Sequence, residues 1–353
     1  MTRLLVASPA PLSGKTAFIA GLALHLRRAG LKVGYFKPVA VPKKRADGQT
    51  LDTDPIFIRA ALSLSESEGQ LAPVGYQPVD WEDYVANPNQ VVNLVREALG
   101  QVEAGKDVVL IEAAEDLPTG ASLGLSAAEI AAGFNAAVIL VLRYQGVASV
   151  DQAVFYGRHF GDRLKGVIFN AVPPERAEFV EQKLRPVLAG QGLPWLGWVP
   201  QARFMLALTV NEIAKILGGR IITAPEKADE LVENLMMATV TPDASQNYFG
   251  RKPNKAVIAA ADRPDIHLAA LETPTRALIL TGNWVPDPIV VARAEEDGVP
   301  IVLVPSGTLA TIEALEAAYG LGKLTQAAKV NPFARLMAEH LDIDRLIQLA
   351  RGS

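Results

Sequence analysis

Residues 8–16 read SPAPLSGKT and lie between a short apolar run and a long amphipathic stretch near the start of the chain. The apolar run predicts a buried strand over Leu4–Ser8, and the stretch after it predicts a helix over Lys15–Ala29. The first turn of a helix presents unpaired N–H groups and a partial positive charge, which together form an anion site. The segment therefore predicts a phosphate-binding loop.

Each residue at the end of this loop has a role in phosphate binding. Gly14 permits close backbone approach, Lys15 would reach the β- and γ-phosphates, and the hydroxyl of Thr16 would ligate Mg²⁺. The loop departs from the usual pattern, because Pro9 stands where glycine is expected and Pro11 has no N–H. The alternative is an ordinary strand–turn–helix that contains Gly-Lys-Thr. The position at the first strand-to-helix turn favours the phosphate loop.

Short apolar runs and amphipathic stretches alternate along the first 200 residues. The expected strands are Leu4–Ser8, Val33–Pro38, Val108–Ala113, Ala137–Leu142, Gly166–Asn170 and Trp195–Val199. The expected helices are Lys15–Ala29, Pro55–Leu62, Pro88–Glu103, Ala127–Ala132, Ser149–Asp162 and Arg176–Ala189. Continuous apolar strands separated by helices predict an α/β fold, a P-loop NTPase-type parallel sheet with helices on both faces. Right-handed crossovers then place the functional loops at the carboxyl ends of the strands.

The alternation resumes after the polar segment Thr241–Pro253, which has the composition of a linker but need not be a domain boundary. The expected elements there are Ala256–Ala260, Asp265–Leu271, Ala277–Leu280, Pro288–Glu296, Ile301–Val304 and Leu309–Tyr319. A second, smaller α/β domain is therefore expected. We divide the chain into a nucleotide-binding domain (1–207), the smaller domain (208–323) and a C-terminal helical extension (324–353).

Polar residues follow the predicted strands near the loop. Lys37 ends the second strand, and Asp52-Thr53-Asp54 follows it. The carboxylates can serve Mg²⁺ or its water shell, or the segment can cap the helix that follows, as Thr53 would do. For Lys37 the alternative is a solvated strand end.

Two later strands also end in polar side chains. Glu112 closes an apolar strand, the arrangement that holds Mg²⁺ in P-loop enzymes. Asn170 closes another, and its amide suits an adenine edge. A turn-forming asparagine ahead of Pro173-Pro174 is an equally good interpretation of Asn170.

These motifs together resemble dethiobiotin synthetase over roughly residues 1–205. The resemblance rests on 13–16 (SGKT), 35–39 (YFKPV), Asp54, 110–112 (LIE) and 167–170 (VIFN). That family uses ATP and Mg²⁺ to close a ring on a carbamate. The resemblance implies that Lys15 and Lys37 bind phosphate or carbamate as catalytic residues, that Thr16, Asp54 and Glu112 hold Mg²⁺, and that Asn170 meets adenine. The implied nucleotide-binding residues are Leu12, Ser13, Gly14, Lys15, Thr16 and Asn170, with ATP or ADP as the ligand.

One segment departs from that family. Residues 112–118 read EAAEDLP where the family has a glycine-rich loop that approaches the substrate. Side chains and negative charge replace glycines there, at a place where backbone amides should meet a carboxylate or carbamate. The departure leaves ATP binding in place and puts the substrate in doubt.

The second half resembles a DRTGG domain over roughly Thr209–Gly322. The resemblance rests on Asp262-Arg263-Pro264-Asp265 and on Thr281-Gly282-Asn283, where Asn283 stands in place of the last glycine. We expect Asp262 and Arg263 to face Thr281 and Gly282 across a sheet edge as a second ligand site, since arginine can clamp an anion. The alternative is an Asp–Arg pair that stabilises two loops.

The order of these two domains resembles the N-terminal half of long phosphate acetyltransferases, which is regarded as regulatory and metabolite-sensing. The C-terminal residues 323–351 contain one or two amphipathic helices, which would pack on the core or form a dimer contact. The 353 residues leave no room for the catalytic acetyltransferase domain.

Composition narrows the function classes. No cysteine is present, which excludes thiolate catalysis and cysteine-ligated metal sites. A net charge of −4 argues against nucleic-acid binding. The apolar start is too short for a signal peptide and no run is long enough to span a bilayer, so we expect a cytoplasmic protein without membrane contact.

Three functions fit these observations. The first is a Mg-nucleotide-binding regulatory module that reports to a metabolic enzyme such as an acetyltransferase, with a homo-oligomeric assembly expected. The second is an ATP-dependent carboxylate or carbamate ligase of the dethiobiotin synthetase class with another substrate. The third is a scaffold that has lost nucleotide binding, which Pro9 makes conceivable.

Overall fold

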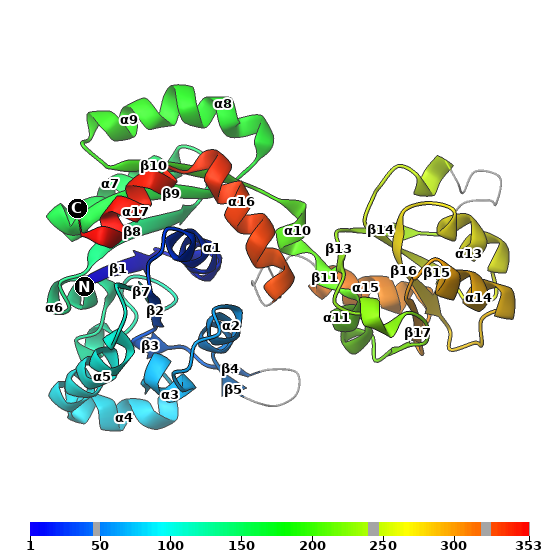
Figure 1. The fold of residues 1–353 in the computed structure, drawn as a ribbon, viewed down its shortest axis with the longest axis horizontal. Coiled ribbons are helices and arrows are strands. Elements are labelled where there is room, and N and C mark those ends of the chain that lie inside the picture. The colour runs from blue at the N-terminus through cyan, green and yellow to red at the C-terminus, as the bar shows by residue number, and fades with distance from the viewer. Residues whose placement is uncertain (45–49, 239–246, 319–325, 353) are drawn as a thin grey trace. The chain divides into compact units, whose positions relative to one another are not determined.

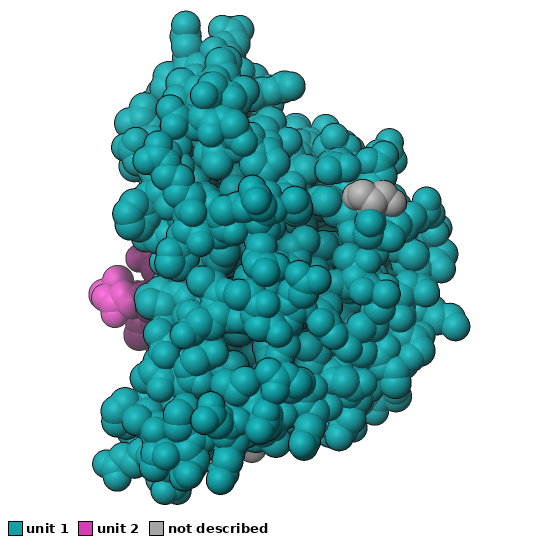
Figure 2. Space-filling view, turned by 90° about the vertical axis from the view of Figure 1, so that its left-hand side faces the viewer, with its two compact units in different colours: residues 1–201, 324–353 teal, residues 202–323 magenta. Residues whose placement is uncertain are grey.

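The computed structural model describes residues 1–44, 50–238, 247–318 and 326–352 (Figure 1). The chain divides into two compact units. Unit 1 consists of residues 1–201 and 324–353, and unit 2 of residues 202–323. Figure 2 shows one face of unit 1 in teal.

Unit 1 is built on a parallel six-stranded sheet in the order β10-β9-β8-β1-β7-β2. Its strands are β1 (Thr2–Ala7), β2 (Val33–Phe36), β7 (Val108–Glu112), β8 (Ala137–Arg143), β9 (Leu164–Val172) and β10 (Trp195–Pro200). The strands are apolar on both faces, because helices cover the sheet on both sides. The predicted α/β fold with a parallel sheet is confirmed.

The helices of the first 201 residues are α1 (Lys15–Arg28), α2 (Thr53–Ala61), α3 (Glu68–Leu71), α4 (Pro78–Ala86), α5 (Pro88–Glu103), α6 (Ala127–Gly133), α7 (Ala148–Phe160), α8 (Ala177–Phe179) and α9 (Arg185–Gly190). Two small strand pairs lie outside the main sheet, β3 (Val39–Ala40) with β6 (Val74–Gly75) and β4 (Lys43–Lys44) with β5 (Thr50–Leu51). Short 3-10 turns occur at Ala121–Leu123, Gly161–Arg163 and Pro174–Arg176.

The helix predicted over Arg176–Ala189 is present as one uninterrupted helical run of α8, a π-helical segment at Val180–Leu184, and α9. The prediction did not include the π-helical segment. Pro186 lies in the first turn of α9 and has no N–H to donate to the preceding turn. Its ring also crowds that turn, which accounts for the change from α- to π-helical hydrogen bonding.

The last thirty residues return to unit 1, where α16 (Val330–His340) packs against α1 and α17 (Ile343–Arg351) packs against β1 and α1 (Figure 1). The crossing with α1 is close, since a Cβ on Gly21 would lie 2.3 Å from the sulfur of Met337. The segment between the two helices joins the edge of the sheet, where the N–H of Asp342 donates to the carbonyl of Leu196 at 3.0 Å. The sequence left open whether these helices pack on the core or form a dimer contact. In the structure they pack on the core of unit 1.

Unit 2 has a five-stranded sheet in the order β12-β17-β16-β15-β14, parallel except for β12. The strands of this sheet are β12 (Arg220–Ile221), β14 (Asn234–Met237), β15 (Lys255–Ala260), β16 (Thr275–Thr281) and β17 (Ile301–Val304). Two further strands of the unit, β11 (Leu208–Thr209) and β13 (Leu231–Val232), pair with each other outside it. Its helices are α10 (Arg203–Leu206), α11 (Val210–Ile216), α13 (Pro264–Leu271), α14 (Pro288–Glu296) and α15 (Thr308–Ala318). Of the polar segment 241–253, residues 241–246 lie outside the described residues.

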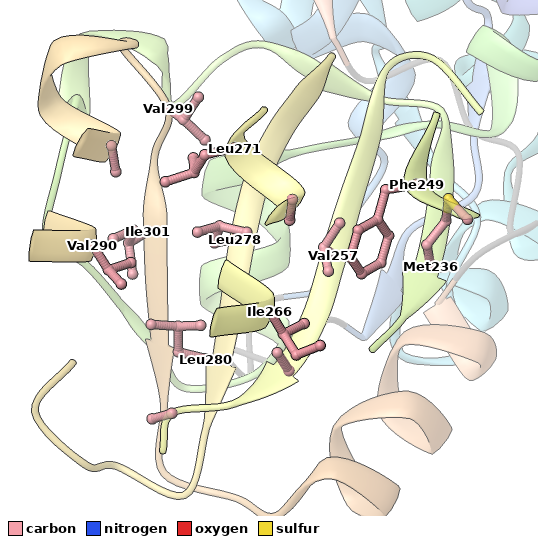
Figure 3. Close-up of a cluster of buried hydrophobic side chains, with 14 of the residues drawn as sticks. Met236, Phe249, Val257, Ile266, Leu271, Leu278, Leu280, Val290, Val299 and Ile301 are labelled. Carbon is pink, nitrogen blue, oxygen red and sulfur yellow. The ribbon is translucent and has the colours of Figure 1, made fainter. Parts of the chain in front are cut away.

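Apolar side chains from β14, β15, β16, α13 and α14 form the core on one face of this sheet (Figure 3). Phe249, Val257 and Leu278 are fully buried within it. A second cluster on the other face includes Val210 and Ile258. Unit 2 thus has its own core on both faces, as an independent α/β domain requires.

Candidate functional site

Near its end, the loop between β1 and α1 has two residues with left-handed backbone conformation, Leu12 (φ 56°) and Gly14 (φ 99°). Gly14 precedes α1, and no side chain caps the helix there. No acidic residue lies in the first turn of α1 either. The N-terminus of α1 therefore keeps the polarity that attracts a phosphate.

Asn170 supports this loop from the end of β9. Its side-chain nitrogen donates to the carbonyl of Ser13 at 2.8 Å. A Cβ on Gly14 would lie 2.1 Å from the same nitrogen, so both the backbone conformation and the contact require glycine. Asn170 lies within a strand, which excludes the turn-forming alternative. Its contact with adenine stays a prediction.

Lys15 is 7% exposed and points back along the loop. Its ammonium donates to the hydroxyl of Ser8 at 2.6 Å and to the carbonyl of Glu115 at 2.9 Å. Burial lowers the pKa of Lys15 to about 8, and neighbouring Glu112 opposes that effect. Both of its hydrogen-bond acceptors are neutral groups. The ammonium of Lys15 therefore forms no ion pair in these contacts and can form one with a bound anion.

Glu112 lies at the end of β7, opposite Val6 of β1, and is 1% exposed. One carboxylate oxygen accepts from the hydroxyl of Thr16 at 2.7 Å, and the other accepts from the hydroxyl of Tyr35 at 2.8 Å. Burial raises the pKa of Glu112, and Lys37 works against that rise. The carboxylate that the sequence predicted beside the loop is therefore in contact with the loop.

Lys37 lies just beyond β2 and is buried, which excludes the solvated strand end. Its ammonium contacts the carboxylates of Asp52 at 2.6 Å and Asp54 at 2.7 Å. Burial alone would lower the pKa of Lys37, but Glu112, Asp54 and Asp52 together outweigh burial and raise it. Lys37 thus stays charged at every ordinary pH.

Asp52 also caps α2, since its side chain accepts from the N–H of Asp54 at 3.0 Å. The capping alternative for this segment is right, but the capping residue is Asp52 and not Thr53. The predicted loop, Lys37, Asp54 and Glu112 therefore meet at one edge of the sheet.

Sequence reasoning missed two participants in this site, Tyr35 and Ser8, and the ion pair that a third, Asp52, makes with Lys37. Tyr35 donates to Glu112, Ser8 accepts from Lys15, and Asp52 pairs with Lys37. Asp52 was within the Asp-Thr-Asp segment already considered. Tyr35 stands in an otherwise apolar strand, and a buried hydroxyl needs a partner, which was the available signal.

Both acidic side chains of the segment after Glu112 have partners within unit 1. Glu115 forms an ion pair with Lys43 of β4. Asp116 accepts from the backbone N–H of Thr119 at 2.9 Å and from its hydroxyl at 2.5 Å. This segment, where the sequence predicts the approach of a substrate carboxylate, is therefore a structured turn. It carries two acidic side chains.

In unit 2, the predicted ligand residues lie at the carboxyl ends of β15 and β16. Arg263 precedes α13, and its guanidinium contacts the carboxylate of Asp265 in the first turn of that helix at 3.3 Å; both side chains are exposed. Thr281 is buried and its hydroxyl lies 2.8 Å from that of Thr308. The N–H of Gly282 donates to the carbonyl of Ser306. Asp262 and Gly282 are exposed, and ligand binding by these residues stays a prediction.

Two negative findings apply to the described residues. No group of three or more acidic, histidine or cysteine side chains among them could by itself hold a metal ion. None of the helices described combines the length and the apolar character needed to span a membrane.

Comparison with known proteins agrees with this two-unit arrangement. A family model described as AAA domain matches residues 2–205, and the DRTGG domain model matches residues 212–318. Phosphate acetyltransferase of Pseudomonas putida is 25% identical over 352 residues, covering 93% of this chain and 49% of its own length. That of Deinococcus radiodurans is 27% identical over 331 residues, covering 86% and 44%. The chain spans about half the length of the curated relatives it matches.

Among solved structures, the CBS and DRTGG domains of the regulatory region of Clostridium perfringens pyrophosphatase, complexed with the activator diadenosine tetraphosphate, are 12% identical with a TM-score of 0.30. That match covers 42% of this chain and 73% of the other. The P-loop geometry, the two-unit division and the family matches agree. The chain belongs to the AAA domain family over residues 2–205, carries a DRTGG domain after it, and resembles phosphate acetyltransferases over about nine-tenths of its length.

Proposed function

We propose that unit 1 binds ATP or ADP together with Mg²⁺, and that the chain is a nucleotide- or metabolite-sensing regulatory module. The convergence of Lys15, Thr16 and Glu112 at the uncapped start of α1 carries this proposal. These residues supply a cation for phosphate and oxygen ligands for a metal side by side at the carboxyl ends of the strands.

A phosphate can replace the present hydrogen-bond acceptors of Lys15. In the free protein its ammonium donates to a hydroxyl and to a carbonyl. A phosphate oxygen carries a negative charge and accepts a stronger hydrogen bond than either group. The terminal phosphates would therefore displace at least one of these contacts.

Mg²⁺ fits the donor set beside Lys15. The hydroxyl of Thr16 and the carboxylate of Glu112 lie in contact, and Asp54 offers a third oxygen ligand if its pairing with Lys37 loosens. Hard oxygen ligands of this kind suit Mg²⁺, which would neutralise charge on the phosphates when bound. Thr16, Glu112 and Asp54 are the residues that would hold it.

The balance of charges favours a sensor over a ligase. Lys37 is the residue expected to receive a carbamate or carboxylate, and two carboxylates already contact it. In the segment that would meet such a substrate, side chains replace glycines, with Glu115 paired to Lys43 and Asp116 accepting from Thr119. A carbamate or carboxylate that approaches Lys37 would therefore compete with the carboxylates of Asp52 and Asp54.

The relatives named phosphate acetyltransferase support a regulatory role next to that chemistry. This chain covers about half of their length, and we propose that it reports nucleotide or metabolite state to an acetyltransferase. A homo-oligomeric state and a cytoplasmic location remain predictions.

Calorimetric titration with ATP, ADP and a non-hydrolysable ATP analogue, with and without Mg²⁺, tests nucleotide binding. We expect wild type to bind all three and Lys15→Ala to bind none. Lys32→Ala is the matched control, since Lys32 is exposed before β2, away from the loop. Failure of the wild type to bind any nucleotide would refute the proposal.

Turnover separates the sensor from the ligase. We expect no ADP release above background across a panel of diamines and carboxylates with bicarbonate. Substrate-dependent ADP release that Lys37→Ala abolishes would assign the ligase instead.

A further inference from the structure

A pocket of about 500 Å³ opens on unit 1 at the amino-terminal side of β9 and β10. The P-loop lies at the carboxyl ends of the strands, so this pocket is on the opposite edge of the same sheet. Its lining residues are Gly157, Arg158, Gly161, Asp162, Leu164, Lys165, Gly192, Leu193, Pro194, Trp195, Leu196 and Arg345. Its volume suits a small metabolite.

Four segments far apart in the sequence build the pocket. They are the end of α7, the start of β9, the turn between α9 and β10, and the first turn of α17. Close packing fixes them together, since a Cβ on Gly157 would lie 2.8 Å from Leu193. The start of α17 is held by the hydrogen bond from Asp342 to Leu196.

The charges in the pocket are unbalanced. Arg158, Lys165 and Arg345 line it together with one acidic residue, Asp162. Within the described chain, none of the three cationic side chains forms an ion pair. In the hydrogen bonds of their guanidinium groups, Arg158 donates to the side-chain oxygen of Gln191 at 3.3 Å and Arg345 to that of Gln348 at 3.2 Å. A concave surface with an excess of one charge attracts ions of the opposite sign.

An apolar wall accompanies these cations. Leu193, Pro194 and Trp195 form it, and Trp195 is about half-buried. The ring of Trp195 lies edge-on to that of Phe169 with centroids 5.0 Å apart, so it is held in place from the core side. A fixed indole beside arginines suits a planar ring that carries negative charge.

We propose that this pocket binds a small metabolite with a planar ring and two or more negative charges, independently of the P-loop. Arg345 belongs to the chain segment that returns to unit 1 after unit 2. A ligand that contacts Arg345 together with Arg158 or Lys165 would therefore tie that returning segment to α7 and β9.

Titration with isophthalate, a benzene ring with two carboxylates, tests the site by calorimetry and tryptophan fluorescence. We expect saturable binding with one ligand per chain, weaker binding of the monoanion benzoate and none of neutral isophthalamide. Phenyl phosphate in a parallel titration distinguishes a preference for phosphate from one for carboxylates. Since a charge-assisted hydrogen bond accounts for about a tenfold change in affinity or more, Arg345→Ala and Lys165→Ala should each weaken binding about tenfold.

Two variants serve as controls. Arg335→Ala removes the same charge from an exposed position on α16 outside the pocket, and it should leave the affinity unchanged. Lys15→Ala should also leave it unchanged, because the P-loop is at the other edge. Absence of saturable binding, equal affinity in the Arg345→Ala variant, or loss of binding in the Lys15→Ala variant would each overturn the proposal. Nucleotide binding by the P-loop is measured separately, so either proposal can fail alone.

Discussion

Nucleotide binding should be coupled to proton uptake by Lys15. Burial lowers the pKa of this ammonium to about 8 in the free protein, so the group is about half protonated at pH 8. Phosphate binds the charged form, and contact with it raises the pKa of Lys15 in the complex. Binding should therefore take up about half a proton at pH 8 and about nine-tenths of a proton at pH 9. Between pH 7 and pH 9 the affinity should fall about tenfold, since the protonated fraction falls by that factor.

Calorimetry of ADP binding without Mg²⁺, in two buffers with different ionisation enthalpies, measures this uptake directly. The last proton of a phosphate leaves near pH 6, so the nucleotide itself contributes little at pH 8. Omitting Mg²⁺ avoids proton release from Glu112, whose pKa is raised. Lys15→Arg keeps the charge at all pH values, so its binding should take up no proton and be independent of pH. Wild-type binding without proton uptake at pH 8, or the same uptake by Lys15→Arg, would refute the reasoning.

Three further substitutions test the surroundings of the site and the core of unit 2. Gly14→Ala should destabilise the protein by about 1–3 kcal/mol in thermal denaturation, because the new Cβ meets Asn170 at 2.1 Å in a left-handed conformation. Gly30→Ala is its control, with a similar φ of 82° and open space, and should cost less. Lys37→Met should destabilise unit 1 by about 3–5 kcal/mol in urea, since it leaves two neighbouring carboxylates without their cation. An equal urea midpoint for this variant and wild type would contradict the pairing. Burial lowers the pKa of Lys255 to about 8, so the unfolded state binds more protons between pH 8 and 10.5 and the free energy of unfolding should rise with pH in that window. Lys255→Met should abolish that contribution in urea titrations at several pH values, and an unchanged slope would argue against it.

The fold was predictable where burial on both faces makes a strand uniformly apolar. Val108–Glu112 is such a strand, and the structure places it between β1 and β2. The packing of α16 on α1 was not predictable. An amphipathic pattern shows that one face of a helix is covered, but it does not identify the element that covers it. The π-helical segment before Pro186 was also missed, since a proline in a helical pattern can start a new helix or interrupt one.

The site was predictable to the extent that strand ends of a parallel sheet share one edge. Lys37 and Glu112 were placed there by this rule alone, and the structure brings both to the loop. Predicting the contact of Tyr35 with Glu112 would have required the register of β2 on β7. In that register Tyr35 pairs with Leu110, two residues before Glu112. The side chains of residues i and i+2 lie on one face of a strand, and only the pairing tells which neighbour they meet.

The contacts around Lys15 connect the loop to the acidic segment that sets this chain apart from the dethiobiotin synthetase pattern. The carbonyl of Glu115 accepts from Lys15, and the side chain of the same residue pairs with Lys43. A phosphate that draws Lys15 forward removes one of the contacts that hold residue 115, while the ion pair remains. A glycine at this position would have no side chain to form that pair. The segment that departs from the dethiobiotin synthetase pattern is therefore held by Lys15 of the loop through its backbone and by Lys43 of β4 through its side chain.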